Sequence, residues 1–541
     1  MDKRVPILII GGGPTGLTLA NLLLDSGIEA IVVEADADTC DHPQAHALNR
    51  RSLEIMRSIG LDDSIREVTD DSVGGAVRFM TSLSGAVLAV VNQNSDESEL
   101  IDPAKLSPCQ SLSCPQDLVE PLLAKKFEAG GGEIWFSSRL LSLQQTASGV
   151  SATIDRNGEQ VECLASWLVG CDGAASTTRK AVQLPMVGPE ELARIVGIYF
   201  YADLDEWLGD IPSVLYWTID EQYPATVINL GHNRWVAHVT LDDDKNTLDT
   251  FTPTRCAEVV NHIVGADVNA EIRGVRPWTM TAQIAARYRN DRVLLAGDAA
   301  HRFPPTGGFG LNTGVADAHN LAWKLAVVIR GEASETLIDT YEAERKPVAE
   351  ANSEFSVINA MGMMAVMGPG AAAQGKRLAD NEVTVAELSA EIQTLMDQQA
   401  AHFNAPGKEM GYIYTAGAVV TDHTALPLAE FSDLVYLPSA IPGARAPHAW
   451  VEEQGKKQSL IDYYKHGFSL VTTSGAWHPS CHELGIRVIE ADDEVAALYG
   501  IDDGAVLVRP DGHVGWRCRG LPDDVSGQLS SVMRSIMCQT I

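Results

Sequence analysis

The sequence predicts a multidomain α/β protein in which a nucleotide-binding sheet is interrupted by an antiparallel insert and followed by a separate α/β unit. A strand, a glycine-rich turn, a helix and a second strand open the chain. Segments with alternating polar and apolar residues, typical of antiparallel strands, fill the region from about residue 191 to 271. A new set of strand and helix patterns begins near residue 412.

Length and composition agree with this division. The 541 residues exceed what one compact core holds, and 45% hydrophobic with 21% charged residues is ordinary for globular domains. The net charge of −32 makes nucleic acid and anionic membrane unfavourable partners, because their phosphate groups would repel the chain.

The cellular location is expected to be cytoplasmic. The nine cysteines contain no CxxC pair and no Cys/His cluster with zinc-like spacing, so we expect free thiols in a reducing compartment and no metal site. The N-terminus lacks the apolar run of a secretory signal. Residues 355–375 carry no charge, but Pro369 and several glycines interrupt them, and no membrane span is expected.

The opening βαβ unit carries the first motif. Strand patterns at residues 5–10 and 28–34 flank a helical pattern at 17–25, and the turn between them contains the residues Gly11, Gly12, Gly13, Pro14, Thr15 and Gly16. The three glycines of a GxGxxG motif allow a tight turn, the approach of a pyrophosphate and close helix–strand packing. Glu34 ends the second strand, where a carboxylate accepts the hydroxyls of an adenosine ribose. This spacing predicts dinucleotide binding, without separating NAD(P) from FAD.

Two later motifs favour FAD. An Asp-Gly turn at Asp172 follows a predicted strand and leads into a polar helix cap. Asp298 ends another strand, before a proline-rich bend at Pro305 and a glycine-rich helix start that includes Gly308 and Gly310. A carboxylate at a strand end suits ribityl hydroxyls, and backbone N–H groups at a helix start suit an anionic reduced flavin.

The remaining patterns set the expected domains. Helices are expected at residues 48–59, at 115–127 and from 321 to about 366, and strands at 165–170, 292–296, 195–201, 213–219, 235–241, 468–472, 485–490 and 505–509. We therefore expect an FAD-binding domain in two parts (1–185 and 276–365), a β-rich substrate insert (186–275), a helical connector (366–410) and a C-terminal domain (411–541).

With these motifs, the chain resembles the single-component (class A) FAD-dependent aromatic hydroxylases, the group of para-hydroxybenzoate hydroxylase and phenol hydroxylase. The GxGxxG, DGxxSxxR and GDAAHxxPPxGGxGxNxG motifs carry the resemblance over about residues 5–350. Segments 442–448, 466–468 and 509–514 are similar to the thioredoxin-like C-terminal domain of the phenol hydroxylase branch. The resemblance implies a Rossmann-like FAD-binding domain of the para-hydroxybenzoate hydroxylase type, an inserted antiparallel-sheet substrate domain and a thioredoxin-like α/β domain.

The resemblance also implies cofactor contacts. Gln116 is expected near the ribityl-phosphate region, Glu34 at the adenosine ribose and Asp298 at the ribityl chain. The pyrimidine end of the flavin is expected against Gly310, Leu311 and Asn312. In this family the Asp-Gly motif, here at Asp172, is associated with FAD and NAD(P)H alike. The family usually has an Arg where this chain has Gln44, which removes a positive charge from the pyrophosphate region.

The catalytic residues are less well marked. His46 follows the ribose-binding strand, where relatives carry an acidic or histidine group near the substrate hydroxyl; it is a candidate acceptor of a phenolic proton, or a residue that only packs beside the flavin. His238 and Tyr216 on the insert strands are candidates for the substrate pocket, although alternation turns half of all strand residues inward. His301 is expected to be structural.

The implied reaction is a monooxygenation. NADPH or NADH reduces FAD, O₂ adds to the reduced flavin as a C4a-hydroperoxide, and the distal oxygen hydroxylates a phenolic or polycyclic aromatic substrate. Baeyer–Villiger insertion, oxidative decarboxylation and a non-turnover flavin-binding carrier protein are the alternatives.

The C-terminal domain has no chemistry that the sequence identifies. Cys481 stands alone, which excludes thioredoxin dithiol chemistry, so a structural role or support of a homodimer is expected. Because every flavin motif ends by Gly314, we expect a truncation before about residue 412 to keep the flavin site assembled.

Overall fold

The computed structural model describes residues 3–92, 102–241, 250–424, 433–453 and 455–539. Its first sheet contains five parallel strands, which in chain order are β1 (Lys3–Ile10), β2 (Ala30–Val33), β7 (Glu133–Trp135), β10 (Glu159–Gly170) and β19 (Val293–Leu295). Their spatial order is β7-β2-β1-β10-β19, so the order reverses between β1 and β10. Doubly wound sheets bind nucleotides at such a switch point. The predicted βαβ opening is confirmed.

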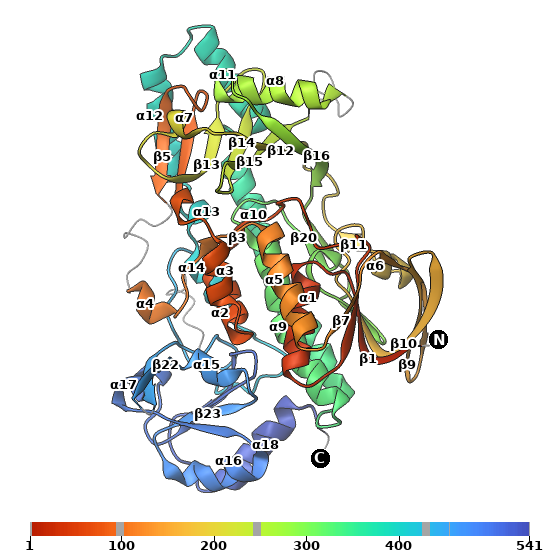
Figure 1. Ribbon diagram of the computed structural model, residues 1–541. Coiled ribbons are helices and arrows are strands. Elements are labelled where there is room, and N and C mark those ends of the chain that lie inside the picture. The colour runs from red at the N-terminus through yellow and green to blue at the C-terminus, as the bar shows by residue number, and fades with distance from the viewer. Residues whose placement is uncertain (1–2, 93–101, 242–249, 425–432, 454, 540–541) are drawn as a thin grey trace.

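Three helices cover one face of this sheet and meet at its nucleotide-binding edge. They are α1 (Pro14–Asp25), α5 (Gln116–Ala129) and α9 (Phe309–Ile329). Both α5 and α9 pack against α1, and all three helices begin near the carboxyl ends of the parallel strands. On the other side of β10, an antiparallel extension forms the outer edge of the molecule at the right of Figure 1; its strands are β8 (Ser138–Thr146) and β9 (Gly149–Arg156).

The second sheet has seven strands and lies at the top of Figure 1. In spatial order they are β16 (Glu271–Met280), β12 (Ala193–Tyr201), β15 (Arg234–Thr240), β14 (Ala225–Asn229), β13 (Ser213–Thr218), β4 (Ala76–Met80) and β5 (Val87–Asn92). The alternation predicted β12, β13 and β15. However, β4 and β5 come from well before the predicted insert of residues 186–275, since β4 pairs in parallel with β13.

Helices cover the two faces of the second sheet unequally. One face packs against α8 (Pro253–Val264) over β12, β13, β14 and β15. The other face is covered over β13, β4 and β5 by α11 (Gly368–Ala379) and α12 (Val385–Asp397). On β12, β15 and β16 that second face turns instead toward the first domain, which it contacts through the Arg234–Asp117 and Arg276–Asp41 ion pairs.

Helix α9 runs through the centre of the molecule (Figure 1). The predicted helix from 321 to 366 is in fact two: α9 ends at Ile329, and α10 (Asp339–Gly362) returns along it after a turn at Gly331, whose φ is +73°. Within the described residues, no helix combines the length and the apolar character needed to cross a bilayer.

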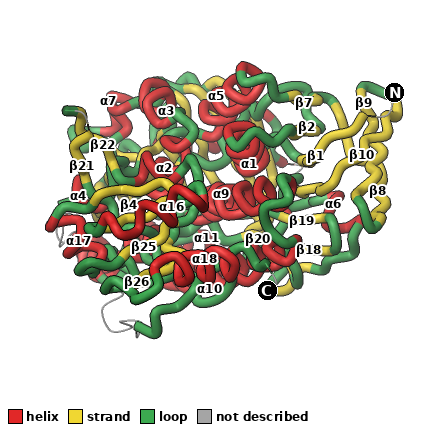
Figure 2. Tube along the Cα trace, turned by 90° about the horizontal axis from the view of Figure 1, so that it is seen from below, coloured by secondary structure: helices red, strands yellow, loops and turns green. Residues whose placement is uncertain are grey.

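The C-terminal domain lies at the bottom of Figure 1 and on the near side of Figure 2. Its strands, in the spatial order β24-β23-β25-β26, are β24 (Arg487–Glu490), β23 (Ser469–Thr472), β25 (Ala505–Val508) and β26 (Val514–Cys518). β23 and β24 are parallel and joined through α16 (His478–Leu484), whereas β25 and β26 are antiparallel and followed by α18 (Val525–Ile536). This is the thioredoxin-like arrangement, and the predicted fold class is confirmed.

Candidate cofactor and substrate site

The glycine turn after β1 has room for a further atom at Gly13, where a ligand phosphate would approach, but not at Gly11 or Gly16. A Cβ on Gly11 would lie 2.3 Å from the carbonyl oxygen of Cys171, and one on Gly16 would lie 2.0 Å from the carbonyl oxygen of Gly11. Both positions therefore require glycine. A Cβ on Gly13 would meet nothing nearer than Glu120 Oε1 at 3.9 Å, so the space above Gly13 can take a ligand atom.

Helix α1 begins directly after this turn with no side-chain cap. Gly13 is its N-cap and Pro14 its first residue. The side chain of Thr15 packs the helix start against the neighbouring motifs, because a Cβ on Gly297 or Gly314 would lie 2.6 or 2.3 Å from its Oγ1. The uncapped N–H groups and the helix dipole favour an anionic group at this point.

Glu34 lies at the end of β2 beside the same turn. Its Oε2 accepts a hydrogen bond from the backbone N–H of Gly12 at 2.6 Å, and its Oε1 accepts one from that of Asp36 at 2.8 Å. The structure therefore fixes this carboxylate next to the turn, where the sequence predicts the adenosine ribose.

The two predicted aspartates differ in how the protein uses them. Asp172 accepts hydrogen bonds from the hydroxyls of Ser176 at 2.5 Å and Thr178 at 3.0 Å, so its side chain caps the short helix α6 (Thr177–Ala181). The Asp298 carboxylate has no hydrogen-bond partner among the described residues. The surrounding protein desolvates Asp298 and raises its pKa, against the attraction of the nearby cationic groups.

The start of α9 is a second uncapped helix N-terminus. Gly307 and Gly308 have φ of +90° and +70°, which favours glycine at both, and the N–H of Gly308 donates to the carbonyl of Pro305 at 3.0 Å. A Cβ on Gly310 would meet nothing within 4 Å, and the neighbouring Leu311 is half-buried. The backbone of this turn thus faces free space.

A backbone segment crosses between the starts of α5 and α9. The Asn312 side chain donates to the carbonyl of Ala47 and accepts from the N–H of Asn49, both at 3.0 Å. From the other side, the N–H of Gln116 donates to the carbonyl of Ala45 at 2.8 Å. Gln116 and Asn312 therefore hold the segment that carries His46.

The predicted glutamine contacts point toward the loop after β2. The Nε2 of Gln44 lies 3.5 Å from the Sγ of Cys40, and the Nε2 of Gln116 donates to Glu120 Oε1 at 2.6 Å. The residues of this site fit FAD, because two uncapped helix starts face free space above Gly13 and Gly310, and the exposed Asp298 carboxylate can accept hydrogen bonds from hydroxyl groups.

His46 and His238 are brought close to each other at the second sheet. His46 Nδ1 lies 3.1 Å from Ser113 Oγ, and burial lowers the pKa of His46 to about 4. Burial, and the proximity of His46 and His42, likewise lower the pKa of His238 to about 4. Both imidazoles are therefore neutral at pH 7 and able to accept a hydrogen bond or a proton.

Tyr216, which was predicted to line the same pocket, does not share a sheet face with His238. Tyr216 pairs with Val227, which pairs in turn with Ala237, so Tyr216 shares the face of Ala237 and is opposite to His238. It is 1% exposed and packs against Trp235 beneath α8, with ring centroids 6.2 Å apart. Successive strand residues point to opposite faces, and the sequence does not show which face is inward.

The structure instead places residues that we did not predict on the His238 face. Gly197 pairs with His238, and Trp278 lies beside it, with ring centroids 5.5 Å apart. On the same face the Nε of Arg234 donates to the hydroxyl of Tyr199 at 3.0 Å, and Arg234 forms an ion pair with Asp117 at the start of α5. The sequence feature that could have indicated these residues is the alternation along residues 195–201, in which every second side chain turns to the face of His238.

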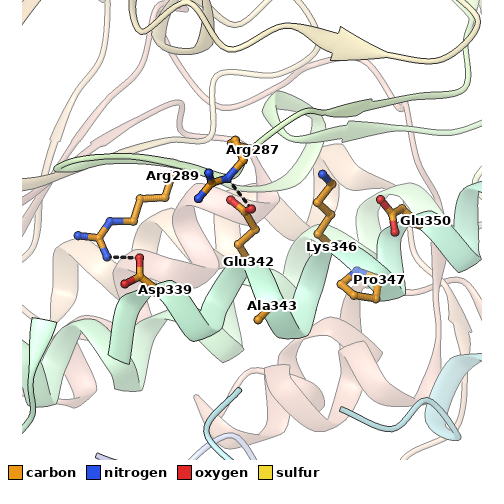
Figure 3. Close-up of a pocket in the computed structure, with 8 residues that line it drawn as sticks. All are labelled: Arg287, Arg289, Asp339, Glu342, Ala343, Lys346, Pro347 and Glu350. Carbon is orange, nitrogen blue, oxygen red and sulfur yellow. Dashed lines mark hydrogen bonds and ion pairs between the residues drawn. The ribbon is translucent and has the colours of Figure 1, made fainter. Parts of the chain in front are cut away.

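A separate hollow of about 360 Å³ lies along α10 and is lined mainly by charged side chains (Figure 3). Arg287 and Arg289 pair there with Glu342 at 2.6 Å and Asp339 at 2.7 Å. Because these charges already neutralise one another and the motifs lie elsewhere, we do not assign the cofactor or the substrate to this hollow.

Two family models match this chain. The family model for an FAD binding domain matches residues 4–356, and the model for the C-terminal part of aromatic-ring hydroxylases matches residues 439–539.

Two relatives and one solved structure match nearly the whole chain. A 2,4-dichlorophenol 6-monooxygenase of Cupriavidus pinatubonensis is 32% identical, over 98% of this chain and 96% of its own. A tetracenomycin B2 monooxygenase-dioxygenase of Streptomyces olivaceus is 32% identical over the full length of both chains. The crystal structure of the flavin-dependent monooxygenase PieE, in complex with FAD and substrate, superposes with a TM-score of 0.90 at 29% identity and covers 99% of each chain.

The chain thus belongs to the family of FAD-dependent aromatic-ring hydroxylases, which are monooxygenases.

Proposed function

We propose that the protein uses NAD(P)H and O₂ to hydroxylate a phenolic or polycyclic aromatic compound. Bound FAD would supply the redox chemistry, by the flavin hydroperoxide route that the resemblance implies. The single observation that carries the proposal is the pair of neutral imidazoles, His46 and His238, between the flavin groove and the second sheet.

The sheet face around His238 suits a flat aromatic ring. Gly197 has no side chain, and a Cβ placed there would lie 3.3 Å from the His238 ring. The Trp278 ring stands edge-on to His238, at an interplanar angle of 69°. Gly197, His238 and Trp278 together form a mostly apolar surface whose only side-chain polar atoms are ring nitrogens. Small-molecule sites usually combine apolar surface with a few polar atoms in this way.

Proton transfer is the second requirement of this reaction, because a phenolate ring is more nucleophilic than a phenol. His46 is held by Ser113 on β6 (Leu112–Ser113), and if its Nδ1 donates to that hydroxyl, its Nε2 is free to accept the phenolic proton. A pKa of about 4 makes His46 a weak base, so it would act by sharing the proton during oxygen transfer.

Dry surroundings are the third requirement, because water promotes loss of the activated oxygen as H₂O₂. On the His238 face, the packed side chains of Tyr199, Ile228 and Val236 are at most 7% exposed and continue the apolar surface away from the glycine.

The proposal is tested by screening phenols and polycyclic aromatic compounds for stimulated NAD(P)H oxidation, with mass spectrometry of the product. A product heavier by one oxygen atom, with the ring intact, supports ring hydroxylation. Ring-expanded or decarboxylated products indicate the alternative oxygenations. FAD binding with no stimulated oxidation by any aromatic compound indicates a carrier protein.

The role of His46 is tested by His46→Ala. We expect oxygen transfer to slow by roughly 10²–10⁴-fold, with extra H₂O₂ and nearly unchanged FAD binding and flavin reduction. His402→Gln is the matched control, because His402 is also buried with a pKa of about 4 but packs against Trp217 beneath the helical cover. Unchanged hydroxylation in His46→Ala removes His46 from the mechanism, and His238→Ala is then the next variant to measure.

A further inference from the structure

Glu120 lies in the part of the groove where the pyrophosphate of FAD is expected. It is one turn after Gln116 on α5, and only 3% of the residue is exposed. Its Oε2 accepts a hydrogen bond from the backbone N–H of Cys40 at 2.7 Å, and its Oε1 accepts one from Gln116 at 2.6 Å. The same Oε1 would be 3.9 Å from a Cβ on Gly13, so the carboxyl group borders the free space above the glycine turn.

The charged groups facing Glu120 are acidic. Glu34 from the end of β2 and Asp117 from its own helix both disfavour its ionised form, and burial contributes most, so that its pKa rises to about 7. Among the described residues, no Lys or Arg forms an ion pair with Glu120. Arg234 is paired with Asp117.

The other groups near the loop after β2 do not supply a cation either. Cys40 has a thiol whose pKa is raised, mainly by burial. Arg276, which faces Cys40, is paired with Asp41 at 3.1 Å. Gln44, which also contacts Cys40, is neutral. A pyrophosphate bound above Gly13 would therefore bring two more negative charges to a carboxyl group that already lacks a positive partner.

We propose that Glu120 contacts the pyrophosphate region of FAD as a neutral acid, and that FAD binding above neutral pH takes up one proton from solvent onto this carboxyl group. The neutral acid can donate its O–H, whereas the carboxylate can only accept. Donation to the amide oxygen of Gln116 would turn the Gln116 amide over and leave its NH₂ free to donate to the cofactor.

The pH dependence follows from linkage. Below pH 7, Glu120 already holds its proton in the free protein, so FAD affinity is constant. Above pH 7 the free protein has lost this proton and must recover it on binding. The dissociation constant of FAD then rises by up to about tenfold per pH unit, until the pH reaches the higher pKa of Glu120 in the complex.

The experiment measures FAD binding by the full-length protein between pH 6 and 9, from the quenching of flavin fluorescence, without substrate or NAD(P)H. We expect the constant to be flat below pH 7 and to rise above it. In Glu120→Gln, whose amide mimics the neutral acid, the constant should stay low and nearly pH-independent. In Gln44→Arg, which adds a cation beside Cys40, FAD should bind more tightly and the slope should shrink.

The matched control is Glu409→Gln. Glu409 on α14 (Pro406–Met410) is another carboxyl group whose pKa burial raises to about 7, but Arg50 is the charged group that faces it, outside the pyrophosphate region. This variant should keep the wild-type pH slope. The same slope in Glu120→Gln as in the wild-type protein overturns the proposal, and so does a flat wild-type profile from pH 6 to 9.

Calorimetry of the wild-type protein decides the question even if Glu120→Gln folds poorly. At pH 8, FAD titrations in two buffers with different ionisation enthalpies should report uptake of nearly one proton, and no uptake overturns the proposal. Because this readout concerns FAD alone, it stands or fails separately from the proposed ring hydroxylation.

Discussion

The predicted cofactor site and the interface with the C-terminal domain both contain charged side chains, but the two regions pair them differently. At the cofactor site, the Asp298 carboxylate is exposed and has no hydrogen-bond partner among the described residues, although the surrounding protein raises its pKa. At the interface, Arg509 donates to both carboxylate oxygens of Glu344, at 2.9 and 2.8 Å, and also pairs with Asp511. Lys324 completes the set through Glu344 at 2.8 Å.

A second buried ion pair crosses the same interface. Glu54 on α2 (Arg50–Ser58) pairs with Arg445 of the C-terminal domain and with Arg51 of its own helix. Burial alone would raise the pKa of Glu54 and of Glu344, but the facing cations lower both to about 2. The difference is that the unpartnered carboxylate lies where a ligand is predicted, whereas the charges at the interface are paired with one another across the two domains.

This contrast corrects our expectation for a truncated chain. Removing the residues from about 412 onward would take Arg445 from Glu54 and Arg509 from Glu344, and would leave each buried glutamate with one cation only, Arg51 and Lys324. We now expect such a truncation to lose stability and FAD together, because the C-terminal domain is part of the structure that holds α9 and α10.

The largest expected effect is that of Arg509→Met. It leaves Glu344 and Asp511 buried without their guanidinium partner, which typically costs about 3–5 kcal/mol. Urea unfolding of the full-length protein measures this loss. Lys376→Met is the matched control: it breaks exposed pairs with Asp380 and Glu221, whose loss should change the stability little because solvent screens them. Equal stability of the two variants would mean that the interface is not a permanent contact.

Asp298→Ala should act in the opposite way. Without FAD, it removes an exposed carboxylate that lacks a hydrogen-bond partner among the described residues, so the free energy of unfolding should stay nearly the same. With FAD, it should weaken binding by about 1.5–3 kcal/mol, the usual contribution of hydrogen bonds to a charged group. Unfolding of the protein with and without FAD measures both effects. A variant that is destabilised without FAD, and binds FAD as tightly as the wild-type protein, contradicts our assignment.

Glu34→Ala should differ from Asp298→Ala in its effect on stability. Glu34 already accepts hydrogen bonds from the backbone of Gly12 and Asp36. Its removal should therefore lower both the stability without FAD and the affinity for FAD, whereas Asp298→Ala lowers only the affinity.

The sequence predicted those parts of the fold that depend on neighbouring residues. The glycine turn at Gly11 and the carboxylate of Glu34 follow from local patterns, and the structure contains both. The thioredoxin-like C-terminal domain, which the structure also contains, was expected only from the family resemblance. It could not predict that β4 joins the second sheet, because the pairing of β4 with β13 links segments more than a hundred residues apart. The Arg509–Glu344 pair, separated by 165 positions, was invisible for the same reason.

The structure places the predicted cofactor residues together, but it separates the strand residues that were predicted to line the substrate pocket. Asp298, Gly308 and Gly310 stand at helix and strand ends, where backbone geometry dictates their placement. Residues in the middle of strands, such as Tyr216 and His238, alternate between the two faces of the sheet. Which face each one occupies depends on the elements that cover the sheet, and these are distant in sequence. For Tyr216, the packing of α8 over its side chain shows which face it occupies.

The smallest expected effect is that of Tyr216→Phe, which tests whether the substrate lies on the His238 face of the second sheet. Tyr216→Phe removes a hydroxyl beneath α8, on the side away from His238, so FAD binding and the rate of substrate-stimulated NAD(P)H oxidation should stay within about twofold of wild type. Stability should change by less than about 1 kcal/mol, the net contribution of an ordinary hydrogen bond. Tyr199→Phe is the matched variant on the other face. It removes the acceptor for Arg234 Nε at 3.0 Å, in the network that joins the sheet to Asp117, and we expect it to raise the KM for the aromatic substrate while FAD binding is unchanged. If Tyr216→Phe changes KM and Tyr199→Phe does not, the substrate lies on the α8 side of the sheet and the site must be redrawn.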